Sequence, residues 1–152
     1  MPSANISSNV SPVCASDVAD EFKTKLKFIL DGGKSKIGIE STVVKLIGKP
    51  LILRPGIIES KIIERILKTK INSNNKNSKI VSPGMLKKHY SPGIPIYLNK
   101  KNPIGSNAFI TLGQKYKNNK NYFNLSKKSD LKVAASNLYK TLRKIKKLKF
   151  KR

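Results

Sequence analysis

The stretch IGIESTVVKLIGKPLILRPG, residues 37–56, carries the clearest pattern of regular structure in this chain. Two runs of mainly apolar and β-branched residues, 41–46 and 51–53, are candidate strands. Gly, Lys and Pro at 48–50 separate the two runs and are typical of a turn, and the Pro-Gly pair at 55–56 ends the second run. We therefore expect two strands joined by a short turn.

The segments on either side of this stretch predict a mixture of helices and strands. Apolar residues at positions 62, 63, 66 and 67 share one face of a predicted helix. Ahead of the stretch, the apolar run 28–30 precedes Asp-Gly-Gly and predicts a strand followed by a turn. Further upstream, Ser16 is a candidate N-cap for a short helix that ends near Phe22.

The second half of the chain repeats this mixture. Residues 94–98, 109–112 and 122–125 are predicted strands, and Ser129 is the expected cap of a long helix. The apolar stripe of that helix consists of Leu131, Ala134, Ala135, Leu138, Tyr139, Leu142 and Ile145. Strands that alternate with helices favour parallel pairing, so the fold class is α/β. A polar Asn/Ser/Lys tract, residues 68–79, separates the halves and indicates an exposed linker.

Charge is the most unusual feature of the composition. The chain has 152 residues, of which 32 are Lys or Arg and 8 are Asp or Glu, so its formal net charge is +24. Two interpretations stay open. One is compositional bias with solvated lysines, because only four of the basic residues are Arg. The other is a surface for a polyanion, because sixteen basic residues and one acid lie between Asn99 and Arg152.

Several protein classes are excluded by composition. A single Cys cannot form a disulfide framework, and one Cys with one His cannot complete a closed zinc site. No apolar run approaches the roughly 20 residues that cross a bilayer, and the N-terminus lacks a secretory signal pattern. We therefore expect a soluble, cytoplasmic protein with no membrane segment.

No complete catalytic constellation or nucleotide-binding consensus is present. The sequence has no G-x-S-x-G, Walker A or G-x-G-x-x-G motif. His89 is interpreted as a loop histidine rather than a base, and Cys14 as a small apolar side chain rather than a nucleophile. The candidate binding residues lie instead in three loop motifs at strand ends: PSAN (2–5), EST (40–42) and RPG (54–56). An Arg fixed before a Pro-Gly turn can neutralise a phosphate or carboxylate.

These motifs, in this order, resemble the C-terminal half of a YrdC-type domain, the catalytic domain of the threonylcarbamoyl-AMP synthase family. The words that carry the resemblance are PSANIS (2–7), ILDGG (29–33), IGIESTVV (37–44), ILRPG (52–56) and, as an interdomain linker, SPGMLKKHYSP (82–92). The resemblance implies that residues 1–70 are the C-terminal part of a YrdC-like α/β domain and residues 71–93 a linker. Residues 94–152 would be part of a smaller Rossmann-like α/β domain.

The resemblance also implies a reaction and a set of site residues. The family joins L-threonine, bicarbonate and ATP into threonylcarbamoyl-AMP and pyrophosphate, with Mg²⁺ accompanying ATP, for the t6A37 modification of tRNA. Motif by motif, Ser3, Asn5 and Ser11 would surround the nucleotide and Arg54 would pair with its phosphate. Tyr90 would fold over the nucleotide as a lid, and Ser41 would contact L-threonine.

The family's catalytic domain also has an earlier half, with Lys-x-Arg and Ser-x-Lys-Pro segments that grip the triphosphate of ATP. These 152 residues contain no such segment. We therefore expect a fragment, from a truncated gene, a misplaced start or a split gene whose second chain supplies the first half.

Two alternatives to an enzyme fragment stay open. One is a basic RNA-binding module that uses the Lys-rich second half and the aromatic residues Tyr116, Tyr122, Phe123 and Phe150. The other is a decayed remnant without function.

Overall fold

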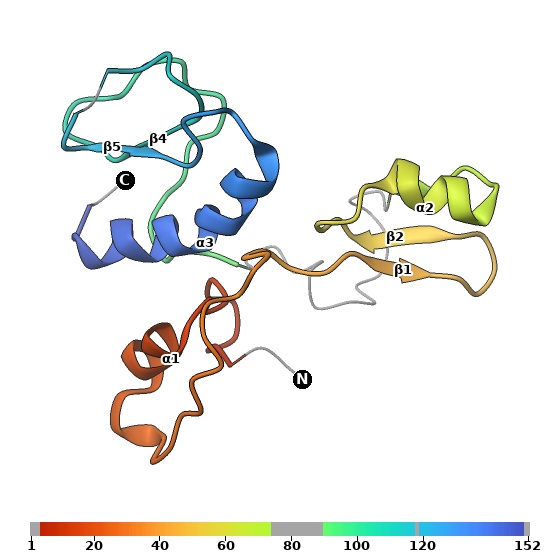
Figure 1. Ribbon diagram of the computed structural model, residues 1–152, viewed down its shortest axis with the longest axis horizontal. Helices are drawn as coiled ribbons and strands as arrows, with labels where there is room; N and C mark the ends of the chain where they lie inside the picture. The colour runs from red at the N-terminus through yellow and green to blue at the C-terminus, as the bar shows by residue number, and fades with distance from the viewer. Residues whose placement is uncertain (1–3, 74–89, 118, 151–152) are drawn as a thin grey trace. The chain divides into compact units, whose positions relative to one another are not determined.

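A computed structural model describes residues 4–73, 90–117 and 119–150 and divides the chain into two compact units. The first unit consists of Met1–Gly38 and Tyr90–Arg152, and the second of Ile39–His89. The described residues form two short sheets and three α-helices (Figure 1). The predicted α/β class is therefore confirmed at this level.

The second unit is built on the predicted pair of strands. Strand β1 (Val43–Lys45) pairs antiparallel with β2 (Leu51–Arg54), and the register shifts between Val43 and Val44. Gly48, at a φ of 75°, lies in the turn between them, where a left-handed backbone favours glycine. The predicted helix is also present, as α2 (Ser60–Leu67).

The tract at residues 68–79 begins differently from our expectation of an exposed linker. Ile71 is buried, and strand β3 (Asn72–Ser73) extends the sheet by pairing parallel with β2. The Glu64 carboxylate, on α2, accepts a hydrogen bond from the Ile71 amide at 2.9 Å. One apolar residue inside a polar tract therefore anchors its start, and from residue 74 the tract lies outside the described residues.

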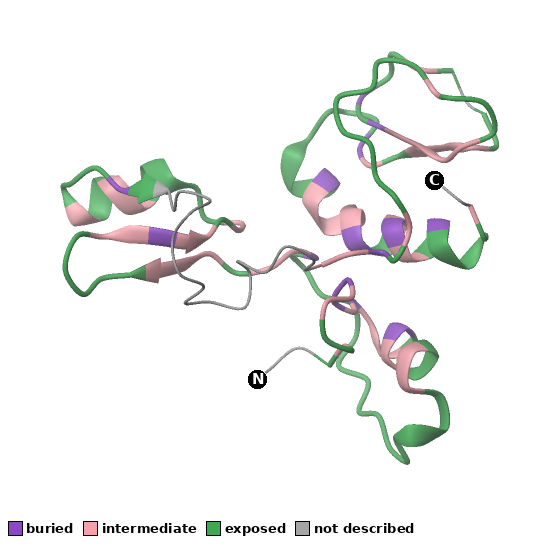
Figure 2. Ribbon diagram, turned by 180° about the vertical axis from the view of Figure 1, so that it is seen from behind, coloured by how far each residue is buried: buried purple, intermediate pink, exposed green. Residues whose placement is uncertain are grey.

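The first unit contains the long helix and the parallel pair that the sequence predicts. Helix α3 (Leu131–Lys147) accompanies strands β4 (Phe109–Thr111) and β5 (Tyr122–Asn124), which pair in parallel. The buried residues of α3, coloured purple in Figure 2, belong to the predicted stripe and are Ala134, Tyr139, Leu142 and Ile145. Leu131, the first stripe position, is 72% exposed, so the buried stripe begins one turn later.

The predicted cap of α3 is wrong by one residue. Asp130 caps the helix, because its carboxylate accepts hydrogen bonds from the amides of Lys132 and Val133 at 2.8 and 3.1 Å. Ser129 adopts a φ of 57° one residue earlier and is not the cap. Similarly, helix α1 (Ala15–Phe22) has Cys14 at its N-cap position, and Ser16 lies inside the helix.

Two predicted strands are absent from the described structure. Residues 94–98 are irregular, and residues 28–30 form no strand and expose Phe28 and Leu30 almost fully. A strand needs a neighbour for its backbone hydrogen bonds, and an apolar run does not reveal whether one is present. A short 3₁₀-helix, η1 (Lys23–Lys25), follows α1 in this part of the chain.

The N-terminal segment and the segment after Tyr90 pack together in the first unit. Val10 and Val13 are buried, Asn9 forms a parallel β-bridge with Ser91, and the Ser91 amide donates to the Ser8 carbonyl at 2.8 Å. Across the described residues, no helix is both long and apolar enough to cross a membrane.

Candidate functional site

The structure brings Ser41 and Arg54, two of the predicted site residues, into direct contact in the second unit. Arg54 donates from Nε to the Ser41 carbonyl at 2.9 Å and from Nη2 to the Ser41 hydroxyl at 2.8 Å. Its Nη1 also lies 3.7 Å from a carboxylate oxygen of Glu40. The guanidinium is thus held on two sides by the EST motif, which fixes its direction at the end of β2.

The RPG motif also contacts the EST motif through its backbone. A Cβ atom at Gly56 would lie 2.4 Å from the Thr42 amide nitrogen and 2.5 Å from the Glu40 carbonyl oxygen, so only glycine allows this approach. Thr42 completes the frame, because its hydroxyl donates to the Ile58 carbonyl at 2.8 Å and accepts from the Ile58 amide at 3.1 Å. The two motifs therefore form one rigid corner.

Asn5 and Ser11, two further predicted site residues, lie in one loop of the first unit, residues 5–11. The Asn5 side-chain amide donates to the carbonyls of Ile6 and Asn9 at 3.0 and 3.3 Å and so stabilises the turn of the loop. Ser11 is buried, with 7% of its surface exposed. Ser3 lies outside the described residues.

Glu21, on α1, organises the same loop. One of its carboxylate oxygens, Oε1, accepts from the Ile6 amide at 2.7 Å and from the Asn9 side chain at 3.0 Å. Its other oxygen, Oε2, forms an ion pair with Arg143. Burial alone would raise the pKa of Glu21, but the hydrogen bonds from Asn9, Ile6 and Arg143 outweigh burial and lower this pKa below its usual value.

Arg143 reaches this loop from α3. Its Nη2 donates to the Val10 carbonyl at 2.8 Å, and its Nε and Nη1 lie 3.5 Å from the carbonyls of Ser11 and Asp17. Neither Arg143 nor Glu21 was among the predicted site residues. The sequence does offer one indication for Arg143: it is the one arginine in α3, beside five lysines, and arginine is the residue suited to several hydrogen bonds at once.

Tyr90 lies beside the loop in the first unit. Its ring stacks on the ring of Tyr139, with centroids 6.0 Å apart and planes 24° apart, and the following residue, Ser91, bridges to Asn9. The predicted roles of Asn5, Ser11, Tyr90, Ser41 and Arg54 stay predictions. His89 lies outside the described residues, and Cys14 is a half-buried free thiol 3.1 Å from the Ser16 hydroxyl.

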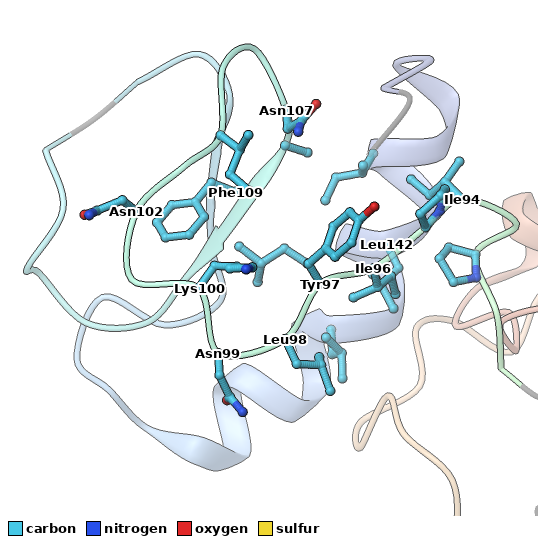
Figure 3. A pocket seen from close by; sticks show the side chains of 17 residues that line it. Ile94, Ile96, Tyr97, Leu98, Asn99, Lys100, Asn102, Asn107, Phe109 and Leu142 are labelled. Carbon is cyan, nitrogen blue, oxygen red and sulfur yellow. The ribbon is translucent and has the colours of Figure 1, made fainter.

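Two cavities are present among the described residues of the first unit. The larger one, of about 440 Å³, is bordered by residues 92–110 and α3, and Figure 3 shows apolar side chains such as Ile96, Tyr97 and Leu142 around it. Within the described parts of the chain, its lining includes none of the predicted site residues. A more open hollow of about 290 Å³ is lined by Pro12, Val13 and most of the ILDGG motif.

Comparison with known proteins places both parts of the chain in one group. Residues 58–152 match the family described as "Threonylcarbamoyl-AMP synthase, C-terminal domain". Residues 1–56 match the Sua5/YciO/YrdC family, described as "Telomere recombination". The YrdC-type resemblance of the motifs is therefore confirmed.

Curated relatives named threonylcarbamoyl-AMP synthase are similar over about two thirds of this chain. The protein of Pyrococcus abyssi is 38% identical over 100 residues, which are 62% of this chain and 29% of the relative. The protein of Bacillus subtilis is 37% identical over 106 residues, 67% of this chain and 31% of the relative. The chain thus spans less than a third of these curated relatives.

A solved structure also matches. A crystal structure of P. abyssi Sua5 complexed with L-threonine is 27% identical, with a TM-score of 0.72, and the match covers 99% of this chain and 49% of that one. Sequence and fold thus agree on the same relatives, and the chain belongs to the threonylcarbamoyl-AMP synthase family.

Proposed function

We propose that this chain takes part in the synthesis of threonylcarbamoyl-AMP from L-threonine, bicarbonate and ATP, with release of pyrophosphate, for the t6A37 modification of tRNA. Family membership supports this proposal, together with the names of the relatives and the L-threonine complex of the matching Sua5 structure. The part of the relatives that these residues do not span would come from a longer form of the chain or from a second chain.

The observation that carries the proposal is the Ser41–Arg54 corner. A guanidinium held by a serine carbonyl, its hydroxyl and a carboxylate is a fixed cation, and a fixed cation beside a hydroxyl suits an anionic substrate. We assign Arg54 to a phosphate of ATP and Ser41 to L-threonine. Asn5 and Ser11 of the first unit, with Ser3, would contact the nucleotide, and Tyr90 would cover it.

The chemistry fits residues that position and neutralise rather than transfer protons. The amine of L-threonine would form a C–N bond with the carbon of bicarbonate, and water would leave. An oxygen of the resulting carbamate would then attack the α-phosphorus of ATP while the bond from that phosphorus to the pyrophosphate oxygen breaks. Arg54 would stabilise the negative charge on the phosphoryl oxygens while the loops hold the two reactants together. Binding and orientation are therefore the main tasks of this chain's residues.

Mg²⁺ is expected from the family rather than from these residues. In the described parts of the chain, no three His, Cys, Asp or Glu side chains gather where they could hold a metal ion. Mg²⁺ would therefore be bound mainly by the phosphates of ATP and water.

The finer architecture belongs to the same proposal. Residues 1–70 would be the C-terminal part of a YrdC-like domain, residues 71–93 a linker and residues 94–152 part of a Rossmann-like domain. A cytoplasmic location is expected for a protein of tRNA modification.

Weak RNA binding by the Lys-rich second half stays a prediction and is not favoured as the main function. Three rings pack edge to face on one another with centroids 5.1 to 6.3 Å apart, those of Phe109, Tyr116 and Tyr122. The ring of Phe123 packs edge to face on that of Phe150. These rings therefore contact each other in the structure, whereas base stacking needs an open aromatic face.

Calorimetric titration of the chain with MgATP and, separately, with L-threonine tests the assignment. Arg54→Ala is expected to weaken ATP binding by about tenfold or more, since a hydrogen bond to a charged group contributes about 1.5–3 kcal/mol. Arg54→Lys keeps the charge but not the paired donors and should fall between. Ser41→Ala should weaken threonine binding instead.

Arg65→Ala is the matched control, because Arg65 is an exposed arginine on α2 of the same unit. It should bind both substrates within about twofold of the wild type. The assignment is overturned if the wild type binds neither substrate, or if Arg54→Ala and Arg65→Ala bind ATP equally well.

A further inference from the structure

Arg143 connects α3 to the loop of residues 5–11 more extensively than a surface ion pair would. Its guanidinium donates to the carbonyl of Val10 and lies within 3.5 Å of two further backbone carbonyls, those of Ser11 and Asp17. It also pairs with the Glu21 carboxylate, and the side chains of the two residues are 14% and 6% exposed. One side chain thus fixes both the end of the loop and the start of α1.

Glu21 extends the reach of Arg143 to the beginning of the loop. Because Oε2 pairs with Arg143, the carboxylate is oriented so that Oε1 accepts from the Ile6 amide and from the Asn9 side chain. Asn9 in turn accepts from the Asn5 side chain through its carbonyl. An uninterrupted chain of polar contacts therefore runs from Arg143 to Asn5.

A lysine could not replace this arrangement. A guanidinium presents five N–H donors in a planar fork, which suits several carbonyls and one carboxylate at once, whereas an ammonium group is a single centre with three donors. The same helix offers a lysine for comparison. Lys147 pairs with Asp20 on α1, but the two side chains are 61% and 44% exposed, so this contact joins two charges at the surface.

We propose that Arg143 is a positioning residue for the nucleotide: by holding Val10, Ser11 and Glu21, it keeps the loop with Asn5 and Ser11 in the shape that binds ATP. The inference rests on the proposed function, because the nucleotide role of this loop is part of it. It goes further in making ATP affinity depend on α3, a helix from the other end of the chain.

The test combines two measurements on the full chain carrying Arg143→Lys, Glu21→Gln or, as the control, Lys147→Ala. Amide hydrogen exchange at Ile6 reports the loop directly, and exchange at Leu142 reports α3. Titration with MgATP and with L-threonine reports the two substrates. We expect Arg143→Lys to lose about tenfold or more in both Ile6 protection and ATP affinity. Protection of Leu142 and threonine affinity should stay within about twofold, as should every value for Lys147→Ala.

Each outcome decides a separate point. If wild type binds ATP and Arg143→Lys binds it equally well, the positioning role is wrong. If threonine affinity and Leu142 protection fall together with ATP affinity, Arg143 has a general structural role and the proposal is also overturned. If wild type binds no ATP while Arg143→Lys still loses Ile6 protection, the nucleotide assignment fails but the connection between α3 and the loop stands.

Discussion

Gly56 is the residue on which the shape of the proposed substrate corner depends most. A methyl group there would overlap the backbone of Glu40 and Thr42, neither of which can move without displacing β1. We expect Gly56→Ala to lower the free energy of unfolding by about 1–3 kcal/mol, the usual cost of overpacking, as measured by urea denaturation.

Gly32→Ala is the matched control for this prediction. Apart from Gly32 itself and its two chain neighbours, no residue has an atom within 4 Å of the Cβ position at Gly32, and its φ is outside the left-handed region. The substitution should change the free energy of unfolding by less than about 1 kcal/mol. Any change should be stabilising, because alanine lowers the conformational entropy of the unfolded chain. Equal effects of the two substitutions would show that the close approach at Gly56 is unimportant.

Glu21 gives a prediction about pH. Its pKa is lower in the folded chain than the ordinary value of 4.5. A group with a depressed folded pKa contributes stability above its unfolded pKa, and this contribution is lost as the pH falls through the folded pKa. Wild type should therefore lose stability relative to Glu21→Gln between about pH 5 and about pH 3, measured by urea denaturation. A constant difference over that range would contradict the expectation.

At the scale of elements, two substitutions at the start of α3 test whether Asp130 or Ser129 caps the helix. Asp130→Ala should destabilise the first unit by about 1 kcal/mol, because the amides of Lys132 and Val133 lose their acceptor. Ser129→Gly should be neutral or slightly stabilising, because Ser129 already has a positive φ that glycine adopts readily. Thermal unfolding followed by circular dichroism checks both. A larger loss for Ser129→Gly would mean that Ser129 is the functional cap.

The elements that the sequence predicts correctly are those whose signal is local. The turn at Gly48 and the stripe ending at Ile145 specify β1, β2 and α3, because turn chemistry and helical spacing act over a few residues. The runs 28–30 and 94–98 are equally apolar but form no strand, since strand formation depends on a distant neighbour. Conversely, Ile71 stands alone in a polar tract and gives no local signal, yet it is buried because the following strand, β3, pairs with β2.

The candidate site divides in the same way. Ser41 and Arg54 could be selected from short motifs, and their contact spans 13 residues. Arg143 and Glu21 could not be paired in advance, because they lie 122 positions apart in the sequence and neither lies in a loop motif. Long-range polar contacts of this kind follow from how segments pack, which residue spacing along one sequence does not encode.

At the scale of the whole molecule, the arginines and lysines that give the net charge of +24 differ in their surroundings. Arg54 and Arg143, two of the four arginines, have side chains only 17% and 14% exposed, and each holds a backbone carbonyl and a carboxylate. Lys147, in contrast, is 61% exposed. These two arginines therefore organise the two proposed binding regions. The exposed Lys147 instead fits the interpretation of the lysine excess as solvated surface charge.

The most direct test of the central claim is pyrophosphate release from ATP in the presence of L-threonine and bicarbonate. The 152 residues are assayed alone and together with a separately produced polypeptide that carries the part of the catalytic domain they do not span. We predict release that requires both substrates, falls by about tenfold or more in Arg54→Ala and is unchanged in Arg65→Ala. No threonine-dependent release in either setting, or equal release by Arg54→Ala and wild type, would contradict the proposed function.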